Sequence, residues 1–117
     1  MTESTYDTFP QQLRISVPGF DRVYDEHVLD NDEVLPHVLM GDLVRFLLDD
    51  VQVHGAGSPV LRAAMALLES AMGSPDPKLQ EVVAVSFLES LDPADPNFLV
   101  IRRSFGPWLE EQYRKYE

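Results

Sequence analysis

The feature that most constrains this chain is the spacing of its apolar residues, which is helical along nearly the whole sequence. Between residues 33 and 50, apolar side chains recur at positions i, i+3 and i+4, and further apolar residues cover the opposite side. No segment alternates apolar and polar residues between turn signals, as a half-buried β-strand does. The spacing therefore predicts an all-α domain, an irregular bundle of five or six helices with residues 33–50 at its centre.

Proline punctuates this pattern and indicates where helices begin. Ser58 precedes Pro59 and Asp76 precedes Pro77, so each pair combines a capping side chain with a proline suited to the first turn. A proline sacrifices no hydrogen bond there, because the first N–H groups of a helix have no partner within it. The predicted helices cover residues 18–31, 33–50, 59–72 and 77–91, with a short helix from 98 and a last helix from 107.

The proline in the central helix is explained if that helix starts a few residues before it. Asp32 is the expected N-cap, Glu33 lies near the positive end of the helix dipole, and Pro36 falls within the first turn. We therefore interpret Pro36 as a start signal.

Asp42 is the most informative single position of this helix. It falls inside the apolar arc, where a bare carboxylate is costly to bury. Arg45 is three residues further on and can reach Asp42 along the helix, so we expect an ion pair between the two. The alternative is that Asp42 lines a partner-binding or catalytic cleft.

The length and composition of the chain fit one domain. It has 117 residues, of which 44% are hydrophobic, enough for a single core of ordinary size. We predict one helical domain over residues 1–117, with residues 1–12 frayed or loosely docked. We find no cysteine, no apolar run near the ~20 residues of a membrane span and no signal peptide, and we expect a cytoplasmic protein.

The charge of the chain is strongly negative, with 20 acidic and 9 basic residues and a formal net charge of −11. Residues 1–58 contain 11 acidic and 3 basic residues, a charge of −8, whereas residues 59–117 contain 9 and 6, a charge of −3. Such a field repels nucleic acid and anionic membranes, so we expect neither as a partner. It attracts a basic protein, although the same charge also serves solubility alone.

The densest group of carboxylates lies between residues 21 and 33, where Arg22 is the only basic residue. Asp21 and Asp25 are about one helical turn apart, so like charges share a face and slightly destabilise the free helix. A cationic partner would compensate this repulsion, and the alternative is a solvated face. We predict a partner-binding surface made of Asp21, Asp25, Glu26, Asp30, Asp32 and Glu33.

Three histidines are the candidates for metal binding. His27, His37 and His54 are 10 and 17 residues apart, so they do not form the close pairs that zinc enzymes use. An approach of His27 to His37 across the intervening turn, with nearby carboxylates, would make a small metal-dependent hydrolase. The alternative is surface histidines that pair with carboxylates. Nucleophile and phosphate-loop motifs are absent, so we expect neither an enzyme nor a cofactor.

Three stretches carry a resemblance to a known family: YDEHVLDNDEVLPHVLMGDLVRFL at 24–47, LQEVVAVSFLESL at 79–91 and the closing FGPWLEEQYRKY. They resemble a family of small bacterial helical proteins without an assigned activity. Some relatives of that family resemble immunity proteins, which bind and neutralise a toxin made by the same cell. The resemblance covers the chain from about residue 18 and implies no catalytic residue.

These features predict a non-enzymatic protein-binding module, with an immunity-type inhibitor of a basic toxin or effector as its specific form. Its acidic residues would occlude the partner, and its charge would speed association. The metal-dependent hydrolase is one alternative. Another is a homo-oligomeric scaffold with Trp108, Tyr113 and Tyr116 at its interface, and the oligomeric state is left open.

Overall fold

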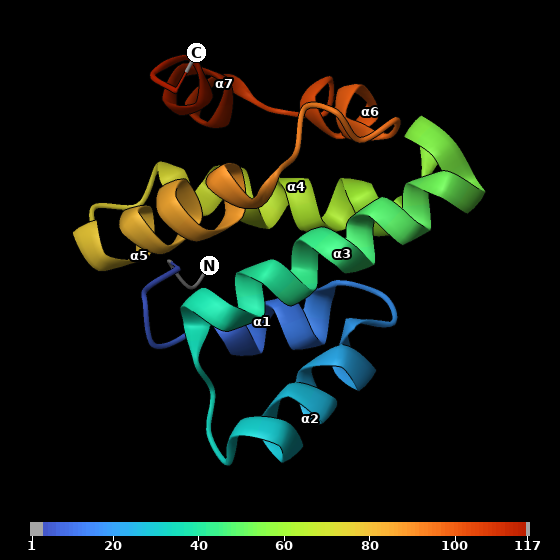
Figure 1. The fold of residues 1–117 in the computed structure, drawn as a ribbon. Helices are drawn as coiled ribbons and strands as arrows, with labels where there is room; N and C mark the ends of the chain where they lie inside the picture. Colours follow the sequence, from blue (N-terminus) through green and yellow to red (C-terminus); the bar gives the residue numbers. More distant parts are fainter. Residues whose placement is uncertain (1–3, 117) are drawn as a thin grey trace.

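The structure is all-helical, as the apolar spacing predicts. The computed structural model describes residues 4–116, and within them it contains seven α-helices and no β-strand (Figure 1). No helix in this described range is both long enough and apolar enough to cross a membrane. The elements are α1 (Phe9–Ser16), α2 (Phe20–Asn31), α3 (Pro36–His54), η1 (Gly55–Gly57), α4 (Pro59–Met72), α5 (Pro77–Glu81), η2 (Val82–Phe87), η3 (Leu88–Ser90), α6 (Phe98–Arg102) and α7 (Pro107–Arg114).

The helix count exceeds the predicted five or six because the sequence pattern does not indicate α1. Its eight residues are too few to form a stable helix in isolation. In the structure, however, Phe9 and Leu13 are buried in the core, and the Ser4 hydroxyl donates to the side chain of Gln12 at 2.8 Å. Residues 1–3 lie outside the described range. Tertiary burial, rather than local helix propensity, therefore explains this helix.

Proline does mark the helix starts. Five of the α-helices carry a proline in the first turn: α1, α3, α4, α5 and α7. The two predicted caps are also present, since Ser58 accepts a hydrogen bond from the N–H of Leu61 at 3.1 Å and Asp76 accepts one from the N–H of Lys78 at 3.0 Å. Local signals of this kind are readable from sequence because donor and acceptor are only two or three residues apart.

Helix α3 is the central element, as predicted. It crosses the middle of the molecule, with α1 and α2 on one side and α4 and η2 on the other (Figure 1). The predicted start at residue 33 with Asp32 as N-cap is wrong, because α3 begins at Pro36 and Asp32 ends α2 with a left-handed backbone at φ +61°. A residue before proline prefers extended backbone, and Leu35 has φ −110° and ψ 96°. Pro36 therefore excludes a helix that already runs through Leu35.

The predicted helix over residues 77–91 is helical nearly throughout but changes type along its length. It is α-helical in α5, π-helical in η2 and 3₁₀ in η3. Its apolar side chains are nevertheless buried, with Val82, Val83 and Phe87 packed in the core next to α3. The sequence thus predicted a helix over these residues but did not distinguish an α-helical from a π-helical turn.

Candidate functional site

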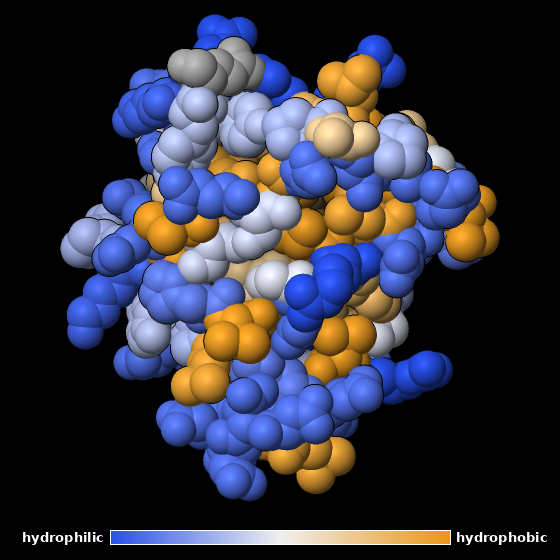
Figure 2. Space-filling model, in the orientation of Figure 1, coloured by the Kyte–Doolittle hydropathy of each residue, from blue (hydrophilic) through white to orange (hydrophobic). Residues whose placement is uncertain are grey.

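The six predicted acidic residues are all exposed and lie on one element, α2, and the turn that follows it. We call them the acidic surface: Asp21, Asp25, Glu26, Asp30, Asp32 and Glu33. Figure 2 shows hydrophilic side chains spread over this end of the molecule, with hydrophobic atoms exposed between them. Leu29 of α2 is 81% exposed and belongs to the same stretch. The acidic surface therefore combines negative charge with an apolar side chain that nothing in the described chain covers.

One member of the acidic surface is already paired. Arg14 of α1 donates to both carboxylate oxygens of Asp25, at 3.0 and 3.1 Å. These hydrogen bonds and the charge of Arg14 hold the pKa of Asp25 below its usual value. The other five carboxylates form no ion pair with any residue of the described range 4–116. Their negative charge is therefore open to a partner.

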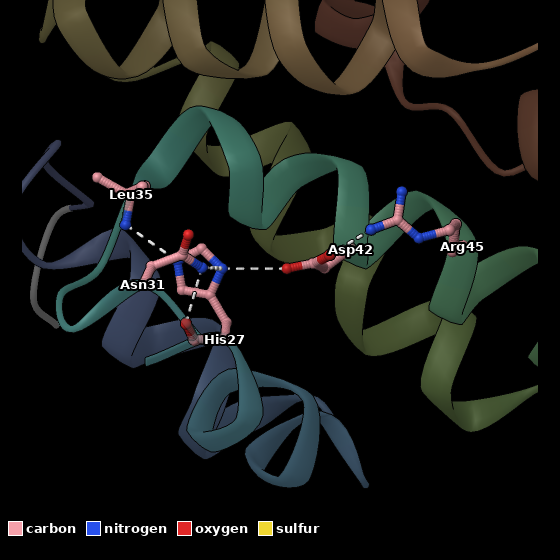
Figure 3. Close-up of polar contacts among 5 residues, drawn as sticks. All are labelled: His27, Asn31, Leu35, Asp42 and Arg45. Carbon is pink, nitrogen blue, oxygen red and sulfur yellow. Dashed lines mark hydrogen bonds and ion pairs between the residues drawn. The ribbon is translucent and has the colours of Figure 1, made fainter. Parts of the chain in front are cut away.

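His27 lies beneath the acidic surface, and its side chain is only 1% exposed. The backbone N–H of Leu35 donates to Nε2 at 3.0 Å, and Nδ1 lies 3.1 Å from Oδ2 of Asp42 (Figure 3). Because a backbone N–H only donates, Nε2 carries no proton, and the hydrogen of the neutral ring is on Nδ1. The ring therefore donates to Asp42 and accepts from the turn, joining α2 to both the α2–α3 turn and α3.

Asp42 connects this histidine to an arginine on α3. One carboxylate oxygen accepts from His27, and the other binds Nη2 of Arg45 (Figure 3). The predicted ion pair between Asp42 and Arg45 is thus present, and it extends into a three-residue chain that the sequence did not indicate. The Asp42 side chain is 21% exposed, so burial of its charge is only partial. Two partners explain how an apolar arc tolerates this carboxylate.

A pocket of about 440 Å³ opens between α2 and α3 where these residues meet. Two members of the acidic surface face it together with His27 and Asp42, and Asn31 donates its side-chain amide to the backbone carbonyl of His27 at 2.8 Å. The lining residues are Val23, Glu26, His27, Asp30, Asn31, Val38 and Asp42. The acidic surface therefore continues inward to Asp42, which lines a pocket and forms the expected ion pair as well.

Comparison with known proteins identifies the family. The chain belongs to the family described as a domain of unknown function (DUF7674). The family's sequence model matches residues 10–117, which include all of α2 to α7 and most of α1. In this respect it agrees with the expected family without an assigned activity. No curated protein and no solved structure matches the chain.

The other two histidines of this DUF7674 domain have separate partners. Nδ1 of His37 contacts the Ser86 hydroxyl of η2, and Nδ1 of His54 lies 3.1 Å from a carboxylate oxygen of Asp50. His27 and His37 are therefore not brought together. In the described range, no group of three or more His, Cys, Asp or Glu residues is arranged to hold a metal ion. No sequence signal indicates the contact of His37 with Ser86, since 49 residues separate the two.

The three aromatic residues of the predicted scaffold interface lie in different environments. Tyr113 is buried between Phe98 and Phe105, with ring centroids 5.8 Å apart in each pair. Tyr116 is 41% exposed and its hydroxyl donates to a backbone carbonyl of η2 at 3.1 Å. Trp108 is 55% exposed. Tyr113 is therefore a core residue, and only the other two residues present aromatic surface.

Glu69 of α4 has a structural role that sequence reasoning missed. Its carboxylate accepts from the N–H groups of Trp108 at 2.6 Å and Leu109 at 3.0 Å, so it caps the N-terminus of α7 from another helix. Gly106 leaves the necessary space, because a Cβ there would lie 2.5 Å from the carboxyl carbon of Glu69. The separation of about 40 residues explains why no local pattern reveals this cap.

Proposed function

We propose that this chain is a non-enzymatic protein-binding module that presents its acidic surface to a basic protein. The observation that carries the proposal is a set of five exposed carboxylates on α2 and the turn after it, none of which forms an ion pair within the described range. A surface of one sign steers an oppositely charged partner and raises the association rate. The specific form we favour is an immunity-type inhibitor, which would occlude a basic toxin or effector made by the same cell.

The electrostatics of α2 support a role outside the isolated chain. A helix C-terminus is the negative end of the helix dipole and favours cations, but the last turn of α2 has no basic residue. Asp30, Asp32 and Glu33 instead place negative charge at this end. Each such placement is unfavourable by roughly 0.3–1 kcal/mol at low ionic strength. A cationic partner bound at this end of α2 would make the electrostatic contribution favourable.

The apolar side chains near the carboxylates support the same proposal. Protein interfaces typically bury a few large side chains inside a polar rim, and those side chains carry most of the binding energy. Leu29 is 81% exposed within the acidic stretch, and Val38 on the wall of the adjoining pocket is 48% exposed. We assign Leu29 to the centre of the interface and the carboxylates to its rim.

The hydrogen bonds of His27 beneath the acidic surface are also suited to binding. His27 holds the α2–α3 turn through Leu35 and holds α3 through Asp42. A surface that is held in place before binding loses less conformational entropy when the partner docks. The buried histidine therefore has a positioning role in this proposal.

The experiment is a binding assay with charge reversal, using as candidate partner the basic product of a neighbouring gene. We expect binding that weakens with added salt and is lost when Asp30 and Glu33 are both changed to Lys. The matched control is the double change Glu81→Lys and Glu89→Lys, which alters net charge equally at exposed positions outside the acidic surface. Equal loss in both variants, or binding that ignores salt, would refute the proposal.

A homo-oligomeric scaffold is the second candidate, and the 55% exposure of Trp108 is the observation that favours it. Sedimentation of the purified chain tests it directly. An oligomer that dissociates in a Trp108→Ser variant, and persists when Asp30 and Glu33 are reversed, would favour the scaffold over the binding module.

A further inference from the structure

The imidazole of His27 holds the end of the turn between α2 and α3. The start of this turn is tied by the Asp32 N–H to the Val28 carbonyl at 2.8 Å, and its Val34 packs against the core. Asp32 is the only residue besides glycine with a positive φ in the described range, at +61°, so the turn adopts a backbone that most side chains disfavour. Three residues further on, the N–H of Leu35 reaches Nε2 of His27 at 3.0 Å. This hydrogen bond ties the end of the strained turn to α2, and it depends on an unprotonated nitrogen.

Protonation of the ring removes this acceptor. An imidazolium carries hydrogen on both nitrogens and only donates, so Nε2–H would face the N–H of Leu35, donor against donor. The hydrogen bond from Nδ1 to Asp42 survives and becomes a charged pair. A proton on Nε2 is therefore incompatible with the closed turn, in which the N–H of Leu35 points at that nitrogen, and compatible with an open one. By linkage, proton uptake shifts the turn towards the open form.

The surroundings of the ring supply negative charge that stabilises the imidazolium once it has formed. Glu26 and Asp30 of α2 and Asp42 of α3 line the same pocket, and Arg45 binds the far oxygen of Asp42. Asp32 and Glu33 extend from the turn itself and are exposed. Charged or titratable groups on the neighbouring elements are engaged elsewhere: Arg14 of α1 binds Asp25, and His37 of α3 binds Ser86 of η2.

We propose that His27 is a proton-sensitive latch, which holds the α2–α3 turn closed when neutral and releases it when protonated. This inference rests on the proposed function for its consequence, since Asp32 and Glu33 of the acidic surface lie in that turn. Release misplaces these two carboxylates, and the added positive charge beneath the surface opposes a cationic partner. Acidification therefore weakens binding, so that a partner held near neutral pH is released in an acidic setting.

The experiment follows the full chain without any partner by ¹⁵N NMR, as the pH is lowered through the histidine range from about 7.5 to 5. We expect Nε2 of His27 to be unprotonated at the start. As it gains its proton, the Leu35 amide signal should shift with the same midpoint. Its protection against hydrogen exchange should fall about tenfold, the factor that corresponds to one hydrogen bond, while amides of α4 keep their protection.

Two sets of variants control this measurement. His37→Gln and His54→Gln should leave the Leu35 response unchanged, because the two side chains hydrogen-bond to Ser86 and Asp50 and not to Leu35. His27→Gln should abolish the response, since an amide oxygen can accept from Leu35 but does not titrate. If this last variant does not fold, the ring and amide signals of the natural chain still decide the question.

Three results would overturn the latch. They are a proton on Nε2 at neutral pH, a Leu35 amide that stays protected while His27 titrates, or a ring that stays neutral until the whole chain unfolds. None of these concerns a partner, so each would leave the binding proposal standing. Conversely, a chain that binds no basic protein would leave a measured latch intact and remove only its proposed consequence.

Discussion

Three carboxylates of the C-terminal half are bound by the fold, whereas most of those on the acidic surface are not. In the C-terminal half, Glu69 caps α7, Asp76 caps α5, and Glu110 binds Arg102 and Arg114 at 3.0 and 3.1 Å. On α2 and its turn, five of six carboxylates form no ion pair with the described chain. A count of acidic residues does not distinguish these two groups of carboxylates. Tracing where each carboxylate finds hydrogen donors separates structural groups from those open to a partner.

The pKa values follow the same division. Hydrogen bonds from the N–H of Tyr6 at 2.8 Å and from Lys78 hold the pKa of Asp76 below its usual value. Arg102, followed by Arg114, does the same for Glu110. On the acidic surface only Asp25 has a lowered pKa, and it is the member that Arg14 binds. Two of the three carboxylates with a lowered pKa thus lie outside the surface that we assign to binding.

The largest effect expected from this comparison is the loss of the α7 cap. Glu69→Ala removes the acceptor of two N–H groups. We expect the free energy of unfolding to fall by about 2 kcal/mol, the size typical of hydrogen bonding to a charged group. Urea denaturation followed by circular dichroism measures the loss. The control is Glu89→Ala, in a similar Glu-Ser pair, which is exposed and should change stability by less than about 0.5 kcal/mol. Equal effects would show that the cap contributes nothing.

A smaller effect is expected for Asp76 when the stability of the fold is measured at acidic pH. Because the folded pKa of Asp76 is lowered, its contribution is complete above the ordinary carboxyl range near pH 4 and is lost as the pH falls through the folded pKa. Asp76→Asn removes the titration and keeps one acceptor oxygen for the cap to Lys78, at the cost of the hydrogen bond from Tyr6. Unfolding midpoints measured from about pH 6 to pH 2.5 should therefore fall less steeply in this variant than in the natural chain. Parallel curves would contradict the assignment.

The smallest stability effect is expected on the acidic surface. Changing Asp30 and Glu33 together to Lys should leave the free energy of unfolding within about 0.5 kcal/mol of the natural chain, or raise it, because positive charge suits the C-terminal end of α2. The same urea titration measures it. A fall of more than about 1.5 kcal/mol in the free energy of unfolding would show that these carboxylates stabilise the fold. The contrast with Glu69, Asp76 and Glu110 would then be lost.

Much of the fold was readable from sequence where the signal is local. Prolines and caps located the starts of α4, α5 and α7, and the apolar stripe identified α3 as the central helix. The pair of Asp42 with Arg45 was also predictable, since residues three apart face each other on a helix. One local signal was misjudged. Asp32 is a residue type common at N-caps, but α3 begins only at Pro36, so Asp32 instead ends α2.

By itself, the sequence determined the helical class, most helix starts and the position of the acidic surface, because those features depend on residues a few positions apart. The tertiary structure decided that Phe9 is buried, how deeply His27 is buried and what it binds, and which carboxylate caps α7. The separations involved are 8 residues from His27 to Leu35, 15 to Asp42 and 40 from Glu69 to Leu109. Contacts at such distances depend on packing between elements, which periodicity and capping patterns do not specify.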